Sequence, residues 1–437
     1  MESIHASAPA RIEESPQGRG AILAARIILG GGLGMFLNLG PVVLFTYGIF
    51  IQPISAQTGW SALSLASAIG PAMLITALSQ PAIGYLLDRH GARKFALVSI
   101  GAFGLGIIAL GALPGSARGF SWCLALATLL GAGQTPLPYS FLVSRWFDRG
   151  RGTALGIALA FSGLGVAVWP AVVGHLLAVV SWRQTYMALG SMVLALGALA
   201  VALIRDPARN SAHDGADHAP PSEGVTLGAA MATGSFWLLV VVAFVIAAEV
   251  TGATVHLPAM LAAHGASPQA AASLASVLGI ASIVSRLFIG VALDYIFAPI
   301  VGFAVFAASA AGCLLLVHTT ADAPVVAAVL LGIGLGAEAD ILAFIASRIF
   351  GVRHFGSIYG VLMVVFLLGT SAGPTLFAVA LNGHGGYPAA LLGSAIAGAC
   401  AACLTLMLSR RAFKYMHGGG TRGGRSGLSL ERTGRDL

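Results

Sequence analysis

The sequence predicts an all-α membrane protein with twelve transmembrane helices in two six-helix bundles, and three observations lead to this prediction. Of the 437 residues, 57% are hydrophobic and only 9% are charged, whereas roughly a quarter of the residues in soluble domains are charged. The apolar residues form long continuous runs, and about 20 residues suffice to cross a bilayer. Features of the first half also recur in the second half at a nearly constant offset.

The apolar runs are predicted to be helices, because lipid cannot satisfy the backbone of an open strand. The first six run over Ala24–Phe50, Ala62–Leu87, Phe95–Leu113, Ser121–Val143, Thr153–Val179 and Thr185–Leu203. The second six run over Phe236–Leu257, Ala270–Leu293, Ile300–Val317, Ala323–Ile345, Ile358–Leu381 and Ala389–Leu408. We therefore expect a cytoplasmic segment over 1–20, an N-terminal bundle over 21–204, a cytoplasmic linker over 205–235, a C-terminal bundle over 236–410 and a basic tail over 411–437.

The basic residues predict the orientation. Of the 23 lysines and arginines, all but Arg118, Arg183 and Arg286 fall on one predicted side of the membrane. Cytoplasmic loops carry the excess of Lys and Arg, so both termini are expected in the cytoplasm and the protein in the plasma (inner) membrane. The net charge of +7 is explained in the same way, and we expect no nucleic-acid partner.

Three features of the first half recur in the second. Gly84-x-x-x-Asp88 returns as Gly290-x-x-x-Asp294, Ser144-Arg145-x-Phe147 returns as Ser347-Arg348-x-Phe350, and Pro170 returns as Pro374. Each pair occupies the corresponding helix of its half. Two parallel repeats place a binding site at their interface, near the middle of the membrane.

The loop after the second span, GYLLDRHGARK, carries Gly84, Asp88, Arg89, Gly91, Arg93 and Lys94. This pattern resembles motif A of the major facilitator superfamily. The resemblance implies the fold of that family and a cytoplasmic gate that latches during alternating access. The second copy keeps Gly290 and Asp294 but lacks the basic residues, so we expect a weaker latch there.

Three further stretches resemble monocarboxylate transporters and their bacterial relatives, which lie near the oxalate:formate antiporters. They are YGIFIQPISAQTGWS (47–61), RWFDRGRGTALGIALAFSG (145–163) and GIASIVSRLFIGVALD (279–294). The last is similar to an eighth span with a substrate-binding arginine, which implies that role for Arg286. The chain departs from the oxalate:formate antiporters in span eleven. Those proteins have a lysine there, whereas this chain has only apolar or small residues over 361–369.

Four ionisable residues lie inside spans, all in the second half: Glu249, Arg286, Glu338 and Asp340. Such residues are costly in lipid and are functional candidates. The planar fork of Arg286 suits a carboxylate, and Ser282 shares its helix face. The alternative is a structural ion pair with Asp340 or Glu338. From the first half, Asn38, Gln134 and Tyr139 are expected to hydrogen-bond the ligand.

These residues predict a secondary transporter of small organic anions, with proton-coupled monocarboxylate symport as the leading hypothesis. Only an acid can lose and regain the proton, so Asp340 is the first candidate carrier, Glu338 the second and Glu249 the third. The alternatives are carboxylate exchange of the oxalate:formate type and a transporter-like receptor that moves nothing. We expect a small carboxylate, a proton and the bilayer as partners, with no obligatory protein partner.

We expect neither an enzyme nor a cofactor or metal site. The sequence has no Walker A motif, and its GxGxG at 332–336 lies inside a span with no strand before it, so close helix packing explains it. The cysteines Cys400 and Cys403 have no second pair or histidine beside them, which favours packing over metal binding.

Overall fold

The computed structural model describes residues 16–206, 224–263, 268–317, 323–382, 386–408 and 412–413. Most of the expected N-terminal segment, linker and basic tail lies outside these ranges. Within them the chain is helical, with one isolated bridge between Gly224 and Gly351. Eleven helical stretches of this part are long and apolar enough to cross a membrane, and a divided helix takes the place of the predicted fourth span.

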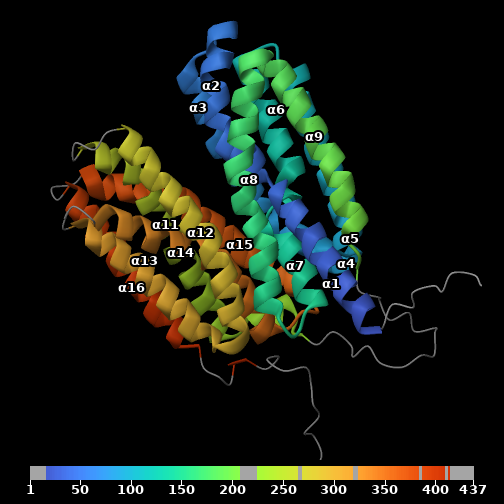
Figure 1. The fold of residues 1–437 in the computed structure, drawn as a ribbon, viewed down its shortest axis with the longest axis vertical. Helices are drawn as coiled ribbons and strands as arrows, with labels where there is room; N and C mark the ends of the chain where they lie inside the picture. Colours follow the sequence, from blue (N-terminus) through green and yellow to red (C-terminus); the bar gives the residue numbers. More distant parts are fainter. Residues whose placement is uncertain are drawn as a thin grey trace, which may run out of the picture.

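Each half of the chain contributes its own set of helices (Figure 1). The N-terminal half comprises α1 (Pro16–Phe36), α2 (Phe45–Thr58), α3 (Ala62–Ser67), α4 (Ile69–His90), α5 (Ala92–Ala112), α6 (Ala117–Leu130), α7 (Pro136–Trp146), α8 (Arg151–Val179) and α9 (Trp182–Leu203). The C-terminal half comprises α10 (Leu227–Met231), α11 (Gly234–Ala263), α12 (Pro268–Tyr295), α13 (Ala298–Val317), α14 (Ala323–Phe350), α15 (Phe355–Asn382) and α16 (Gly386–Leu406).

The fourth span is not the continuous helix expected over Ser121–Val143. Helix α6 ends at Leu130, a 3₁₀ turn follows at Gly131–Gly133, and α7 begins at Pro136. Glycine weakens a helix interior, and proline lacks the N–H that an interior position needs but is favoured at a helix start. The local sequence GAGQTP therefore ends one helix and starts another.

The first span is interrupted as well, because α1 ends at Phe36 and a π-helical turn over Gly40–Leu44 precedes α2. The two interruptions touch, since the backbone N–H of Leu39 donates to the carbonyl oxygen of Gln134 at 2.8 Å. Irregular backbone at membrane depth must be satisfied by protein. The interruption of the first span thus provides the donor, and that of the fourth span the acceptor, of a hydrogen bond that satisfies both.

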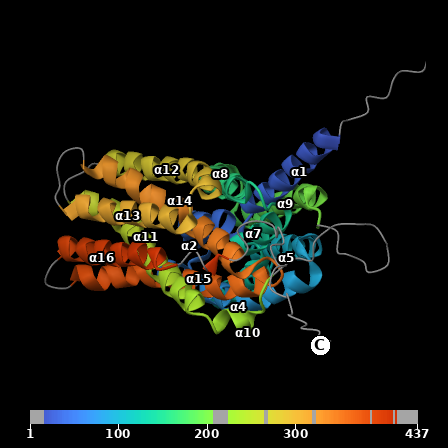
Figure 2. The ribbon, with the colours of Figure 1, turned by 90° about the horizontal axis from the view of Figure 1, so that it is seen from below.

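The two halves meet at one end and diverge toward the other (Figure 1). We call the meeting end the basic end, because it carries Asp88–Lys94, Arg145–Arg151 and Arg348. There α15 packs on α4, and α12 packs on α8. Figure 2 shows the same crossing from below, with α4 under α15 and α8 beside α12.

Both crossings depend on glycines that let the backbones approach closely. A Cβ atom added at Gly84 would collide with the carbonyl oxygen of Gly356, and one added at Gly290 would lie 2.6 Å from that of Gly152. Small residues permit such approaches between membrane helices. The repeated glycines thus set the two contacts between the halves.

The substitution Gly84→Val is expected to lower the melting temperature by several degrees, because overpacking a tight contact costs about 1–3 kcal/mol. The matched control is Gly101→Val, since a Cβ atom at Gly101 meets nothing within 4 Å. Thermal unfolding of both purified variants in one detergent checks this. Equal losses would show that the change reflects helix propensity rather than the crossing.

Candidate functional site

The buried ion pair of Arg286 and Asp340 joins α12 to α14. The Nη1 of Arg286 donates to Oδ1 of Asp340 at 2.7 Å. The Asp340 side chain is 1% exposed and that of Arg286 is 16% exposed. The second oxygen of Asp340, Oδ2, is buried and has no hydrogen-bond partner among the described residues. One carboxylate oxygen and part of the guanidinium therefore remain available to a third group.

Glycines of α14 bring these two side chains together. A Cβ atom at Gly332 would lie 2.5 Å from the carbonyl oxygen of Leu278, and one at Gly336 would collide with Ser282 and Ser285. The GxGxG stretch thus lets α14 lie directly on the backbone of α12. Since Asp340 follows Gly336 by one helical turn, it is held at the level of Arg286.

The other two acids lie apart from this hydrogen bond. Glu338 is buried, its Oε2 has no partner among the described residues, and it interacts electrostatically with Glu249, Arg286 and Asp340. Glu249 accepts hydrogen bonds from Ser309 at 3.0 Å and Cys313 at 3.3 Å. Glu249 is thus bound to α13, while Glu338 keeps one carboxylate oxygen without a partner in the described part of the chain.

The three polar residues expected to bind ligand from the first half all make hydrogen bonds within that half, and two of them bond to each other. The hydroxyl of Tyr139 donates to Oε1 of Gln134 at 2.6 Å, and Nε2 of Gln134 donates to Ser99 at 3.0 Å. Asn38 donates to Ser162 at 3.1 Å and accepts from the backbone N–H of Gly40 at 2.9 Å. These groups stabilise the interrupted first and fourth spans, and no hydrogen bond joins them to Arg286 in the described part.

Ser282 lies one turn before Arg286 on α12, and its hydroxyl donates to the carbonyl oxygen of Gly279 at 2.9 Å. It is therefore near the ion pair but engaged with its own helix.

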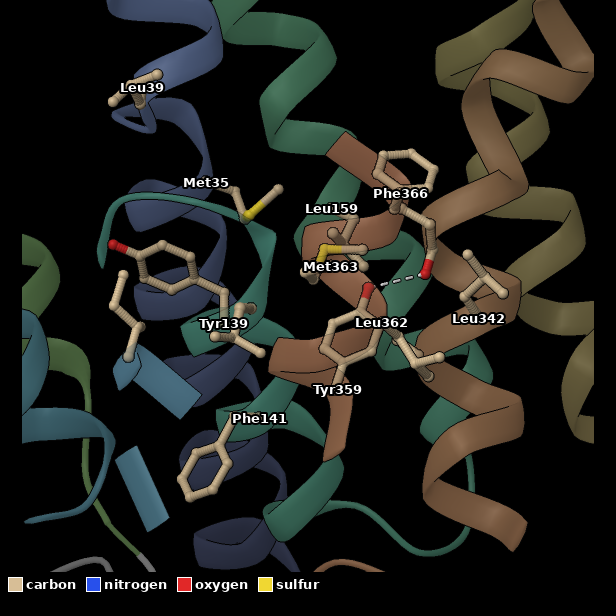
Figure 3. Close-up of a cluster of buried hydrophobic side chains, with 14 of the residues drawn as sticks. Met35, Leu39, Tyr139, Phe141, Leu159, Leu342, Tyr359, Leu362, Met363 and Phe366 are labelled. Carbon is tan, nitrogen blue, oxygen red and sulfur yellow. Dashed lines mark hydrogen bonds between the residues drawn. The ribbon is translucent and has the colours of Figure 1, made fainter. Parts of the chain in front are cut away.

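One buried apolar cluster contains residues of both halves. Figure 3 shows Met35 and Leu159 from the first half and Met363 and Phe366 from α15. Tyr359 of α15 belongs to this cluster, and its hydroxyl donates to the carbonyl oxygen of Ala339 at 3.1 Å. It also interacts electrostatically with Asp340 and Arg286. Sequence reasoning missed Tyr359, because its span also carries the hydroxyls of Thr370, Ser371 and Thr375 and nothing in the sequence distinguished it from them.

At the basic end, the repeated aspartates cap helices of the opposite half. Asp88 accepts from the backbone N–H groups of Gly356 and Ser357 at 3.0 and 2.8 Å, and from the Ser357 hydroxyl at 2.6 Å. Asp294 accepts from Gly152 and Thr153 in the same way, at 2.7, 2.8 and 2.6 Å. Each aspartate thus holds the first turn of α15 or α8, where a carboxylate is favoured.

The second latch, which is expected to be the weaker one, makes the same set of hydrogen bonds as the first. The two aspartates make matching bonds, so the basic residues of GYLLDRHGARK are not needed for them. The loop turns at Gly91, which has φ +83, and is tied to the residue stretch after α9, because Asp206 accepts from the backbone N–H of Ala92 at 2.7 Å.

A third link crosses the basic end between the loop after α7 and the end of α14. The Nη1 of Arg348 donates to Oδ1 of Asp148 at 2.6 Å, and Nη1 of Arg151 donates to the hydroxyl of Ser347 at 3.0 Å. The second repeated motif, Ser347-Arg348, therefore also contacts the opposite half. Together the three links close this end of the molecule.

The substitutions Asp88→Asn and Asp294→Asn are expected to speed amide hydrogen exchange by similar factors, about fivefold, at the first turns of α15 and α8 respectively. An amide keeps the acceptor but loses the charge, which is worth about 1 kcal/mol at a helix N-terminus. Exchange measured by mass spectrometry on both variants checks this. An effect confined to Asp88→Asn would contradict the equivalence of the two caps and indicate that the neighbouring basic residues strengthen the one at Asp88.

Known proteins with similar sequences are membrane transporters. The family model of the Major Facilitator Superfamily matches residues 31–374 and 239–429. The MFS-type transporter pytF of Aspergillus terreus is 31% identical over 40% of this chain and 58% of its own length. The oxalate:formate antiporter of Oxalobacter formigenes is 28% identical over 45% of this chain and 46% of its own. The chain thus spans less than two thirds of these relatives.

Solved structures of transporters share the fold. The fucose:proton symporter of Escherichia coli superposes with a TM-score of 0.67 over 90% of this chain and 98% of its own, at 16% identity. The human organic anion transporter MFSD10 superposes with a TM-score of 0.68 over 90% of this chain, at 12% identity. At such identities the likeness concerns the arrangement of helices alone.

Proposed function

The chain belongs to the major facilitator superfamily of membrane transporters, and from that premise we propose that it carries small monocarboxylates together with a proton. The observation that supports this proposal is the buried pair of Arg286 and Asp340 with its unpartnered Oδ2. The guanidinium can hold one carboxylate through two parallel hydrogen bonds. The pair thus provides an anion site and a titratable acid at one place.

The two groups are linked by competition for charge. In the empty site Asp340 neutralises Arg286. When a substrate carboxylate takes the guanidinium, Asp340 is left buried without a cation, and an uncompensated buried charge costs several kcal/mol. A proton on Asp340 removes that cost. Binding of the anion and uptake of the proton are therefore coupled in this proposal.

The closed basic end determines from which side of the membrane a substrate can reach Arg286. If that end faces the cytoplasm, as the positive-inside rule favours, the diverging ends of the halves open to the outside. Substrate would then approach Arg286 from outside. Release inward would require the three links at Asp88, Asp294 and Arg348 to open, with the halves rocking about the site as other transporters built from repeats do.

Carboxylate exchange is the second candidate, and one observation favours it. The oxalate:formate antiporter is among the similar proteins. In that case Asp340 would only position Arg286, and no proton would move. We place it second because Asp340 offers an acid at the site, which exchange does not require.

Ligand charge separates these candidates. We expect lactate to bind and oxalate to bind at least tenfold more weakly, because one arginine leaves the second carboxylate of oxalate without a cation. That imbalance costs several kcal/mol in a buried site, and about 1.4 kcal/mol already corresponds to tenfold. Thermal-shift titrations of the purified protein measure both affinities. Oxalate binding as tight as lactate would reject the monocarboxylate proposal.

A further inference from the structure

A cavity lies within the C-terminal half, lined by neither Arg286 nor Asp340. It has a volume of about 280 Å³ and is enclosed by α11, α15 and α16. Its walls are mostly apolar, with Phe244, Leu376 and Phe377 as the largest side chains, and Ser394 and Glu249 are the polar residues that line it. Leu376 is 53% exposed, so the cavity opens at the outer, apolar surface of the helices. Figure 2 shows α15 and α16 side by side there.

Glu249 is the charged residue that lines this cavity. The Ser309 hydroxyl lies 3.0 Å from both of its carboxylate oxygens, and the Cys313 thiol donates to Oε1 at 3.3 Å. Both donors come from α13. The α16 backbone leaves room for the carboxyl, since a Cβ atom at Gly398 would lie 3.3 Å from its carbon. The carboxyl is thus held between α13 and α16, and Glu249 is one of the residues that line the cavity.

The cavity carries a negative group without a matching cation. Among the described residues Glu249 forms no ion pair, and the Ser309 and Cys313 donors favour the carboxylate. Without a cation, a buried anion is costly, so the empty cavity favours the neutral acid. A ligand that brings a positive charge would allow the carboxylate to form with its donors already in place.

We propose that this cavity, hereafter the Glu249 pocket, binds a small amphiphilic amine that reaches it through the bilayer. The neutral amine dissolves in lipid and enters between α15 and α16. Its nitrogen takes the proton of Glu249, so one O–H bond breaks and one N–H bond forms. The resulting ammonium pairs with the carboxylate, while the apolar body occupies the space between Phe244, Leu376 and Phe377.

Other ligand classes fit these residues less well. A carboxylate would bring a second negative charge beside Glu249. An acyl chain would fill the apolar part but leave the acid without a charge partner. Among amphiphiles of similar size, the chemistry of the pocket therefore selects the amine.

Occupation of the Glu249 pocket would affect α15. That helix packs on α4, and Asp88 caps its first turn, so α15 is one of the helices joining the two halves. An amine lodged between α15 and α16 would restrain it and slow transport. This consequence depends on the proposed function, whereas binding does not.

The test uses the full chain in nanodiscs, with dicyclohexylcarbodiimide as the reagent for apolar acids. A protonated carboxyl adds across its C=N bond, and the product rearranges to a stable N-acylurea with no leaving group. Mass spectrometry reads the labelling of Glu249 in the presence of N,N-dimethyl-2-phenylethylamine, a tertiary amine that cannot form an amide with the activated carboxyl, or of its uncharged counterpart 2-phenylethanol. We expect the amine to reduce labelling at least fivefold and the alcohol to leave it within twofold.

Two variants make the result specific to the pocket. Gly393 lines it, and a Cβ atom there meets nothing within 4 Å, so Gly393→Leu should fill the space and abolish the effect of the amine. Leu392→Phe is the matched control, because Leu392 is 47% exposed and lies outside the lining. Equal protection by the alcohol, or amine protection that persists in Gly393→Leu, would overturn the proposal. None of these readouts requires transport.

Discussion

Replacing Arg286 with glutamine is expected to abolish monocarboxylate binding and uptake, the largest effect of any single change considered. Removing one partner of a buried, hydrogen-bonded charge pair costs about 2–5 kcal/mol, or at least about thirtyfold in affinity. Arg286→Lys should recover only part of this, because the ammonium lacks the planar fork that holds a carboxylate by two bonds. Titration with lactate and uptake into proteoliposomes measure both effects.

The control for this substitution addresses the partner left behind. In Arg286→Gln, Asp340 stays buried without its cation and the fold itself is destabilised. The double variant Arg286→Gln with Asp340→Asn removes both charges, so it should regain thermal stability but not lactate binding. Normal uptake by Arg286→Gln, or binding by the double variant, would remove Arg286 from the substrate site.

Replacing Asp340 with asparagine is expected to separate substrate movement from proton movement. An amide cannot carry the proton, so accumulation driven by a pH gradient should be lost. Exchange of labelled for unlabelled lactate at equal pH should continue, because Arg286 can still bind the anion. Counterflow and gradient-driven uptake in the same proteoliposomes give the two readouts.

The other acids serve as controls for this prediction. Glu338→Gln leaves the hydrogen bond between Arg286 and Asp340 in place, and Glu249→Gln changes a residue bound to Ser309 and Cys313 instead. Both should retain gradient-driven uptake. If Asp340→Asn accumulates lactate and Glu338→Gln does not, the proton carrier is Glu338 and Asp340 only positions Arg286.

The sequence predicts the fold well because its signals are local and strong. Long apolar runs leave helices as the only state that lipid tolerates, and Gly84 and Gly290 with their aspartates mark the repeat. Glycine and proline at Gly131–Pro136 are typical of a helix break. The apolar residues around them nevertheless led to the prediction of one continuous span. Two half-length helices there, α6 and α7, are what the local backbone preferences dictate.

The site could be predicted only in part, because partners depend on tertiary packing. An arginine inside a span marks Arg286, and equal depth along two helices suggests Asp340 as its partner. The hydrogen bonds of Tyr139 and Gln134 to each other could not be foreseen, since residue type alone does not say which way a side chain turns. The matching contacts of Asp294 and Asp88 could not be foreseen for a related reason: each aspartate is bound by the first turn of a helix in the opposite half, and the residues around it do not reveal that partner.

The most direct test of proton-coupled monocarboxylate transport is lactate uptake into proteoliposomes that contain no internal carboxylate. An anion moving alone against an inside-negative potential costs about 2.3 kcal/mol per 100 mV, and one proton per lactate cancels this cost. We predict accumulation when the lumen is made alkaline, with no change when a potassium diffusion potential is imposed. Uptake that ignores the pH gradient and requires carboxylate inside the vesicles would contradict symport and establish exchange.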